Sequence, residues 1–408
     1  MTPRKLRRWA GNLAAAGLAV GLVLASCEIA ARIALANRRG KEGAEVQSYT
    51  EFDSDLGWVK RPGAHARYTR TEYTVDISIN SLGMRDRERT VDPPPDTQRV
   101  LALGDSFVEG YTVSADEMAT RVMERTLSHP GCRVEVLNGG TAGYSTDQEL
   151  IFYRKTGRSF KASTVVLFFY YNDILANASF TYSARSKPLF ASHNGQLSLA
   201  RPAFPSEPEP VAAVAPRTLP RGSAAWAWLK DRLMRGAPRT YNRLASLGLW
   251  PPLEPTRWIP DEMLVYRNPY PRRIGAAWHL TELLLAALSR DVAQAGAHFL
   301  VAYVPASMEV RDASWDVTRT VYGMGRKWSR DAVVRHLEEV GRRRGFDVLD
   351  LTPELRGAEA WWRTTYFTYD PHWNSLGHLV AGRAVAHELT RRGWIQCRAA
   401  APAPPSQR

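Results

Sequence analysis

The stretch that decides the fold is Arg99-Val-Leu-Ala-Leu-Gly-Asp-Ser-Phe107, in which an apolar run stops at a glycine followed by two small polar residues. A run of this kind is typical of a buried parallel strand. In open α/β sheets, reacting groups gather beyond the carboxyl ends of such strands. The stretch therefore predicts a first core strand at Val100–Leu103 and makes Ser106 the first candidate for chemistry.

The rest of the body repeats a pattern of strand, loop and helix. Four further apolar runs predict strands, at 133–137, 164–171, 298–304 and 346–351. Segments with helical periodicity predict helices at 116–127, 146–158, 274–295, 329–343 and 376–391. Strands that alternate with helices at this spacing indicate a parallel sheet with helices on both faces. We therefore expect an α/β fold, arranged as a three-layer α/β/α sandwich.

Composition divides the chain into further segments. Residues 41–97 predict an irregular cap with short strands, and three consecutive prolines, 93–95, close it. The core is expected at 98–180 and 261–396, and 397–408 has the composition of a disordered tail. Residues 181–260 hold twelve of the 26 prolines and a basic helix candidate at about 224–247. This insertion covers the mouth of the site, lies near a membrane surface or is a partly ordered loop.

Charge is concentrated outside the predicted core. Of the net charge of +13, residues 1–40 contribute +6 (seven Lys/Arg, one Glu) and residues 181–260 contribute +7 (eleven Lys/Arg, four Asp/Glu). The remainder sums to about zero, which argues against nucleic acid as a partner, because a binding domain carries its basic excess on the folded module. The glycines at 139, 140 and 143 lack the context of a dinucleotide or phosphate loop, and we expect no cofactor.

The amino terminus predicts a membrane anchor. Four basic residues (Arg4, Lys5, Arg7 and Arg8) precede an uncharged stretch from Trp9 to Cys27, long enough at about 28 Å to span a hydrocarbon core. Basic residues on the near side keep that side cytoplasmic, so residues 1–40 form a tip and a single anchor in a bacterial inner membrane, with the body in the periplasm. A cleaved signal peptide, or a lipoprotein made at Leu24-Ala-Ser-Cys27, are the alternatives.

Two cysteines are expected in the exported body. Cys132 begins a predicted strand and Cys397 follows the last predicted helix. Both positions fall on the rim of the sheet away from the predicted site, and an exported protein is allowed disulfides. We treat a Cys132–Cys397 disulfide and two unrelated buried thiols as equal alternatives.

A serine needs a base to take its proton and a group to orient that base. The segment Asp370-Pro-His372 follows the last predicted strand and lies at the same sheet edge as Ser106. Residues two apart in an extended segment face the same side, so Asp370 can orient His372 while the imidazole points at Ser106. A metal site that uses Asp370, His372 and His378 is not expected, because His378 falls within the last predicted helix.

Acyl transfer also needs hydrogen-bond donors for the developing oxyanion. Gly143 lies in the loop after the second predicted strand and can present its N–H group. Asn172 follows the third strand and can present its side-chain amide. Ser106, Gly143, Asn172 and the Asp370–His372 pair thus arrive at successive carboxyl ends of one sheet.

These four blocks resemble the SGNH/GDSL hydrolase superfamily. Gly104-Asp-Ser-Phe107 is similar to its nucleophile block, Gly143 to its oxyanion glycine, Tyr171-Asn-Asp173 to its asparagine block and Asp370-Pro-His372 to its last block. The resemblance implies a flavodoxin-like sheet and an oxyanion hole formed by Ser106 N–H, Gly143 N–H and Asn172. Aspartate stands two residues before histidine, whereas the common pattern has three. Together with the membrane segment, the Asp-x-His-Trp-Asn form resembles the exported branch that includes alginate O-acetylation proteins.

The resemblance implies a membrane-tethered serine esterase or O-acyltransferase that acts on acetyl esters of glycans through an acyl-Ser106 intermediate. A membrane-bound acyltransferase is a candidate partner. Two alternatives remain: a catalytically idle glycan-binding or assembly subunit on the same fold, and a GDSL-type lipase. The sequence identifies neither the glycan nor its binding residues, because fold does not decide substrate.

Overall fold

The computed structural model describes residues 3–39, 49–183, 185–204, 223–250, 259–360 and 363–395. Cys397 and the tail at 397–408 lie outside these residues, so the predicted disulfide and the predicted disorder stay predictions. The described elements form two compact units. One unit contains α1 (Pro3–Arg39), α6 (Ala224–Gly236) and α7 (Pro238–Ser246). All other elements belong to the second unit, which we call the hydrolase unit.

A five-stranded parallel sheet forms the centre of the hydrolase unit, as predicted. Its strands in spatial order are β6 (Arg133–Asn138), β5 (Thr97–Leu103), β7 (Thr164–Tyr170), β12 (His298–Val304) and β13 (Asp347–Asp350). The chain leaves β5 on one side to form β6 and returns on the other side to form β7. The order therefore reverses between β5 and β7, which is where open α/β sheets place their ligands.

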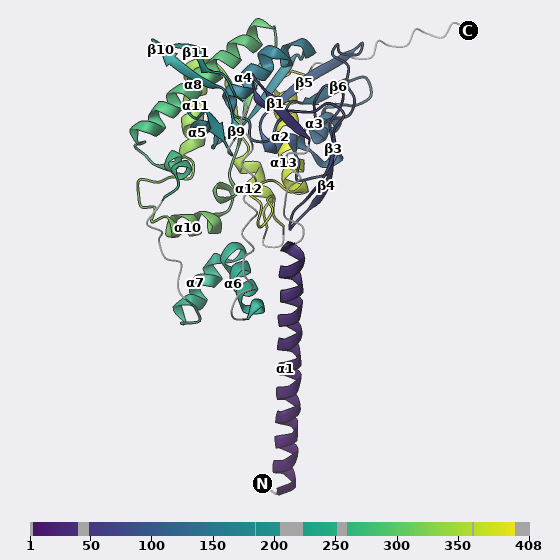
Figure 1. Cartoon of the computed structure of the whole chain (residues 1–408), viewed down its shortest axis with the longest axis vertical. Coiled ribbons are helices and arrows are strands. Elements are labelled where there is room, and N and C mark those ends of the chain that lie inside the picture. The colour runs from purple at the N-terminus through teal and green to yellow at the C-terminus, as the bar shows by residue number, and fades with distance from the viewer. Residues whose placement is uncertain are drawn as a thin grey trace, which may run out of the picture. The chain divides into compact units, whose positions relative to one another are not determined.

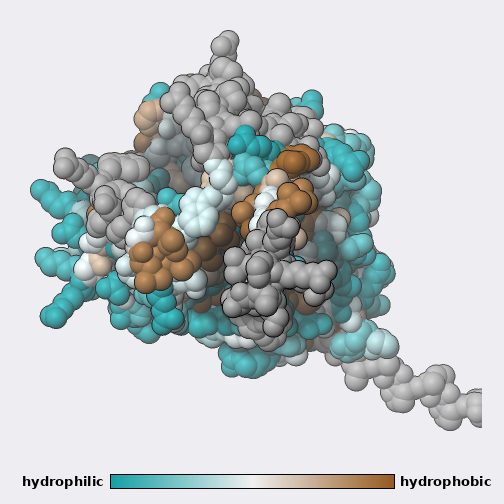
Figure 2. Space-filling model, turned by 90° about the horizontal axis from the view of Figure 1, so that it is seen from below, coloured by the Kyte–Doolittle hydropathy of each residue, from teal (hydrophilic) through white to brown (hydrophobic). Residues whose placement is uncertain are grey.

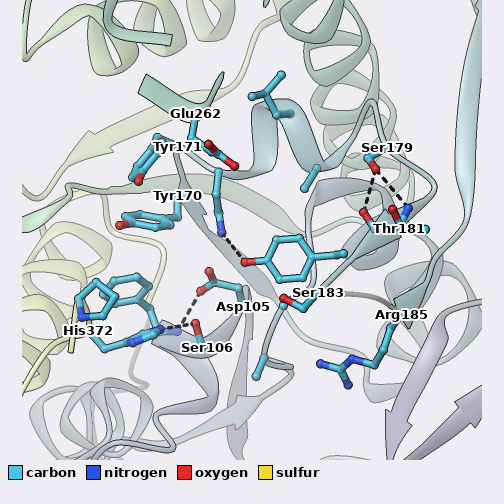
Figure 3. Close-up of a pocket in the computed structure, with 18 of the residues that line it drawn as sticks. Asp105, Ser106, Tyr170, Tyr171, Ser179, Thr181, Ser183, Arg185, Glu262 and His372 are labelled. Atoms are coloured by element: carbon cyan, nitrogen blue, oxygen red, sulfur yellow. Dashed lines mark hydrogen bonds between the residues drawn. The ribbon is translucent and has the colours of Figure 1, made fainter. Parts of the chain in front are cut away.

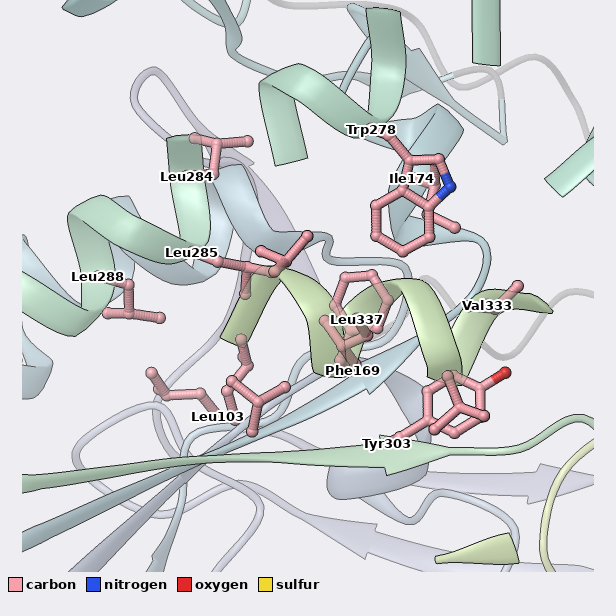
Figure 4. Packing of buried hydrophobic residues seen from close by; sticks show 14 of the residues in the cluster. Leu103, Phe169, Ile174, Trp278, Leu284, Leu285, Leu288, Tyr303, Val333 and Leu337 are labelled. Carbon is pink, nitrogen blue, oxygen red and sulfur yellow. The ribbon is translucent and has the colours of Figure 1, made fainter. Parts of the chain in front are cut away.

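The sheet is buried on both faces because its strands are apolar at consecutive positions. Along β7, Val165, Leu167 and Phe169 belong to one hydrophobic cluster, and Val166 and Phe168 belong to the other. This alternation follows from the two-residue period of a strand. Figure 4 shows the first cluster, in which Trp278 and leucines of α8 (Arg272–Gln294) lie near side chains of the sheet.

Helices cover both faces of the sheet and form the two outer layers of the sandwich (Figure 1). α4 (Thr146–Lys155), α8 and α11 (Ala332–Arg344) supply the first cluster. α3 (Ala119–Leu127), α12 (Thr352–Ala358) and α13 (Ser375–Arg391) supply the second. The long helices match their predictions to within a few residues. The helices α9 (Ser307–Val310), α10 (Asp312–Val321) and α12 were not predicted, and α9 and α12 are short helices of the kind that depend on tertiary packing.

Two antiparallel hairpins precede the sheet. β1 (Thr50–Asp53) pairs with β2 (Gly57–Lys60), and β3 (His65–Thr69) pairs with β4 (Thr74–Ser78). In β4, Val75 and Ile77 are buried while their neighbours are exposed, as the alternating sequence predicts. The turn between β3 and β4 contacts the loop at residues 368–370.

The Pro-rich insertion divides between the two units. Its first part forms two hairpins of the hydrolase unit, β8 (Thr181–Tyr182) with β9 (Arg185–Ser186) and β10 (Leu189–His193) with β11 (Gln196–Arg201). Directly after β9, Lys187 forms a buried ion pair with Asp147 of α4, at 2.5 Å. Both side chains are fully buried, so this pair ties the insertion to the core.

The second part of the insertion forms α6 and α7 in the unit of α1. Sequence periodicity predicts one basic helix at 224–247, but Pro238 begins a new helix after Ala237, because proline cannot accept an interior helical position. Among the described residues, α1 is the one helix long and apolar enough to span a membrane, over Ala15–Ile33. Large apolar side chains of this unit are exposed, among them Leu22, Val23, Trp226 and Leu247. Figure 2 shows exposed apolar surface in brown on the face seen from below.

Candidate active site

Ser106 stands at the turn that follows β5, as predicted. Gly104 allows this turn, since a Cβ atom there would lie 2.5 Å from Cγ2 of Val108. Ser106 is the first residue of α2 (Ser106–Glu109). The side chain of Asp105 accepts a hydrogen bond from Phe107 N–H, at 2.9 Å, and so caps the helix. The backbone therefore turns directly after the strand and places the Ser106 hydroxyl at the sheet edge.

His372 and Asp370 form a chain of hydrogen bonds with Ser106, the arrangement of a catalytic triad, which we call the catalytic line. Ser106 Oγ lies 2.7 Å from His372 Nε2, and His372 Nδ1 lies 2.5 Å from Asp370 Oδ1. His372 N–H also donates to Asp370 Oδ1, at 3.0 Å. The loop that carries both residues ends at α13, which Asn374 caps by accepting hydrogen bonds from the next turn. The structure thus brings the three predicted catalytic residues together in the order expected from the sequence, with His372 between Ser106 and Asp370.

The β3–β4 turn holds the catalytic aspartate from its other side. Tyr73 donates its hydroxyl proton to Asp370 Oδ2, at 2.7 Å. The carboxylate of Glu72 accepts the N–H groups of Thr368, Tyr369 and Asp370, at 2.7, 2.7 and 3.1 Å. Sequence reasoning missed both residues, because nearly 300 positions separate them from the loop they contact. No local motif marks them, and only covariation with the loop among homologues would have pointed to them.

The environment keeps Asp370 ionised. Burial raises the pKa of this carboxyl, but hydrogen bonds from His372 and Tyr73 and the nearby imidazole outweigh burial and hold the pKa below its usual value. Burial and the charge of Asp370 raise the pKa of Tyr73, so the phenol stays protonated and remains a donor. Asp370 can therefore fix the imidazole tautomer that leaves Nε2 free to accept the proton of Ser106.

Asp105 behaves differently from Asp370. Its carboxyl is 3% exposed, and burial raises its pKa to about 6, against the hydrogen bond from Phe107 N–H. His372 lies close enough to lower this pKa in part. A second carboxylate thus lies near the catalytic imidazole without belonging to the catalytic line.

The predicted oxyanion donors face the same space as Ser106. Gly143 has a φ of +80°, a conformation that side chains rarely adopt, and a Cβ atom there would approach the ring of Tyr182 to 3.0 Å. Within the described residues, the N–H groups of Ser106 and Gly143 donate to no protein acceptor. Asn172 lies beside them, but its Nδ2 donates to the hydroxyl of Tyr182, at 3.2 Å. Tyr182, which sequence reasoning missed, therefore occupies the amide in this structure.

These residues line one pocket of about 690 Å³ (Figure 3). Tyrosines dominate its wall: Tyr111, Tyr170, Tyr171 and Tyr182. Polar side chains complete it: Ser179 precedes the insertion, and Thr181, Ser183 and Arg185 belong to it. The pocket thus combines a nucleophile with aromatic faces and hydroxyl groups.

His378 lies apart from this chemistry. It is buried within α13, where its Nδ1 accepts the N–H of Ala119, at 3.2 Å, and burial lowers its pKa to about 3. It is therefore a neutral residue of the helix packing. In the part of the chain that the structure describes, no group of three His, Cys, Asp or Glu side chains is placed to hold a metal ion.

A parallel α/β sandwich with a Ser-His-Asp line at its topological switch point defines a serine hydrolase of the SGNH fold. The chain belongs to the GDSL-like lipase/acylhydrolase family, whose model matches residues 102–380. That range contains all three residues of the catalytic line. No curated protein matches the chain.

Solved structures that are similar to this chain have low sequence identity to it. A lipase/acylhydrolase from Enterococcus faecalis is 14% identical, with a TM-score of 0.38, over 74% of this chain and 100% of that chain. A catalytic mutant of an acetylxylan esterase from Geobacillus stearothermophilus is 11% identical, with a TM-score of 0.38, over 74% and 97%. A G-D-S-L family protein from Desulfitobacterium hafniense is 11% identical, with a TM-score of 0.36, over 71% and 98%. Likenesses of this size carry no argument about the substrate.

Proposed function

We propose that this chain is an exported, membrane-tethered serine esterase or O-acyltransferase that acts on acetyl esters of glycans. The observation that carries the proposal is the line from Ser106 Oγ through His372 to Asp370, at 2.7 and 2.5 Å. It opens on a pocket in which two backbone N–H groups lack a protein acceptor among the described residues.

The reaction follows from this geometry. Ser106 Oγ attacks the ester carbonyl carbon while His372 Nε2 takes the hydroxyl proton. The N–H groups of Ser106 and Gly143 stabilise the oxyanion, and the amide of Asn172 joins them when it leaves Tyr182. The C–O bond to the alcohol then breaks, and His372 returns its proton to the leaving oxygen. Water or a sugar hydroxyl next attacks the acyl-Ser106 carbonyl, with His372 again as base, and releases acid or a new ester.

The wall of the pocket supports a small acyl group on a sugar. Tyrosine rings offer faces on which sugar rings can pack, and tyrosine, serine and threonine hydroxyls offer hydrogen bonds to sugar hydroxyls. A lipase would need an apolar groove for a long acyl chain. The polar side chains of the insertion instead favour a short acyl group.

The leader supports a tethered enzyme. Glu28 of α1 accepts hydrogen bonds from Ser223 Oγ and from the N–H groups of Ala224 and Ala225, at 2.8, 2.9 and 3.0 Å. A signal peptide cleaved beyond Glu28 would lose this cap of α6. The contact therefore favours a mature protein that keeps Glu28, as an anchor or as a lipoprotein at Cys27. Mass spectrometry of the mature amino terminus separates the two, because a diacylglyceryl group on Cys27 would overturn the anchor.

The activity is tested by covalent labelling. A fluorophosphonate probe should modify Ser106, and peptide mass spectrometry should locate the adduct there. No adduct, with no turnover of p-nitrophenyl acetate, would favour an idle glycan-binding subunit. Faster turnover of long-chain than of acetyl p-nitrophenyl esters would indicate a lipase. Acetate release from acetylated xylan, alginate and peptidoglycan then identifies the glycan class, and acetyl transfer to added sugar identifies an acyltransferase.

A further inference from the structure

One cation in the wall of the catalytic pocket forms no ion pair with the residues that the structure describes. Arg185 begins β9 and lines the same pocket as Ser106 and His372. Figure 3 shows its side chain beside the pocket, on the side of the β8–β9 hairpin, while Glu262 lies elsewhere on the rim. Arg185 is half-buried, whereas Glu262 is exposed to solvent. The wall is therefore basic on one side and acidic on another.

The flat face of the Arg185 guanidinium packs against the ring of Trp58. Its Cζ atom lies 4.1 Å from the centroid of a ring of Trp58, which is itself buried. A cation–π contact of this kind leaves the in-plane N–H donors free, because it does not use them. In the part of the chain that the structure describes, no acceptor takes these donors and no carboxylate forms an ion pair with them. Burial lowers the pKa of Arg185, because removing the guanidinium from water disfavours its charged form.

The carboxylate that favours the charged form of Arg185 already accepts two other hydrogen bonds. Glu109 accepts the hydroxyl of Tyr49 and the N–H of Ala142, both at 2.6 Å. It also lies close enough to Lys60 and Arg85 to favour their charged forms, as it does for Arg185. The single carboxylate of Glu109 thus interacts with three cations, so the surroundings of Arg185 carry a net positive charge.

We infer that Arg185 forms an anion subsite and that the natural substrate carries a carboxylate or a phosphate group near the ester that Ser106 attacks. The in-plane fork of a guanidinium matches either anion with two parallel hydrogen bonds. Ion pairing with an acidic glycan would offset the desolvation free energy of Arg185, whereas a neutral glycan would leave the guanidinium without an ion pair. This inference rests on the proposed esterase function and adds the charge of its substrate.

The test compares acetyl esters of sugars that differ at carbon 6, where they carry a neutral group, a carboxylate or a phosphate. The three probes are the acetylated forms of methyl glucoside, methyl glucuronoside and methyl glucoside 6-phosphate. The full-length protein should cleave one or both anionic esters with the higher kcat/KM. Arg185→Gln should lower kcat/KM for the preferred anionic ester about 10- to 100-fold more than it lowers kcat/KM for the neutral ester and for p-nitrophenyl acetate. Preference for the glucuronoside assigns a carboxylate, and preference for the 6-phosphate assigns a phosphate.

Two further measurements guard against a folding effect. Arg185→Lys keeps the charge but loses the fork, and should restore part of the preference for the anionic ester. In the unmodified protein, free glucuronate or glucose 6-phosphate should inhibit p-nitrophenyl acetate hydrolysis more strongly than glucose, and added salt should weaken this inhibition. Equal losses on charged and neutral esters in Arg185→Gln, or no preference in the unmodified protein, would overturn the inference alone. Loss of every esterase activity in the unmodified protein would instead overturn the proposed function.

Discussion

The two sides of the catalytic pocket come from different kinds of structure. On one side, Ser106, Gly143 and Asn172 follow β5, β6 and β7, so the sheet itself places them. The second group, which we call the hairpin side, lies outside the sheet: Tyr73 of the β3–β4 turn contacts Asp370, and Arg185 of the β8–β9 hairpin lines the pocket. Backbone geometry positions the first set, whereas side-chain contacts across long sequence distances position the second.

The two sides therefore have different tasks: one carries out the chemical step, and the other sets its pH dependence and its substrate selectivity. The sheet side holds the nucleophile and the N–H groups that act on the reacting carbonyl. The hairpin side reaches the reaction through Asp370 and faces the rest of the substrate. We therefore expect changes on the sheet side to abolish turnover, and changes on the hairpin side to alter stability, pH dependence or selectivity.

The largest effect should follow removal of the nucleophile. Ser106→Ala should lower kcat/KM for p-nitrophenyl acetate at least about 10³-fold, because no other group forms the acyl intermediate. The matched control is Ser192→Ala, on the exposed end of β10, which should keep full turnover. Thermal unfolding of both variants should match that of the unmodified protein. Turnover retained by Ser106→Ala would remove the sheet side from the chemistry.

The next effect concerns how the hairpin side is attached. Lys187→Met leaves Asp147 as an uncompensated charge in a fully buried pair, and should lower the free energy of unfolding by about 3–5 kcal/mol. Lys155→Met is the matched control. Its pairs with Asp53 and Asp55 are partly exposed, so its loss should stay below about 1 kcal/mol. Urea titration measures both variants, and equal losses would show that the buried pair does not secure the insertion.

Asp105 gives the sheet side a pH signature of its own. Burial raises its folded-state pKa to about 6, whereas an unfolded aspartate titrates near about 3.9. Between these pH values the folded protein holds a proton on Asp105 that the unfolded chain has released. The contribution of protonated Asp105 to the free energy of unfolding is therefore fully present below about pH 4 and is lost as the pH rises through about 6.

Asparagine can keep the cap without ionising. The free energy of unfolding of Asp105→Asn, minus that of the unmodified protein, should therefore rise by about 1–3 kcal/mol from about pH 4 to about pH 7.5. Urea titration at the two pH values measures this difference. A difference that does not change with pH would contradict the assignment.

The smallest effect should come from the phenol that contacts Asp370. Tyr73→Phe removes a hydrogen bond that lowers the pKa of Asp370, so that pKa should rise. Because catalysis needs Asp370 ionised, the acid limb of the kcat/KM profile should move to higher pH, so kcat/KM should fall about tenfold at acid pH and change little at neutral pH, where Asp370 stays ionised. A uniform loss at every pH would instead indicate a packing role for Tyr73.

Prediction from sequence succeeded where a short range of residues carries the signal. The strand ends and the Ser106 turn are local, and residues 370 and 372 lie together on one loop, so their facing sides follow from strand geometry. It failed for α6 and α7, which Pro238 separates, and for the helices α9, α10 and α12. It also missed the two hairpins of residues 181–201, whose strands have little apolar alternation.

The amino-acid sequence alone determined the order of strands and helices along the chain and the apolar leader, because periodicity encodes them. It predicted Ser106, Asp370 and His372 as site residues through their motifs and the sheet edge that they share. Only the tertiary structure decided what surrounds the catalytic line: Tyr73 and Glu72 on the Asp370 loop, Tyr182 on Asn172, and Arg185 on Trp58. These contacts join residues far apart in the chain. Their energies depend on burial and distance, which no local pattern records.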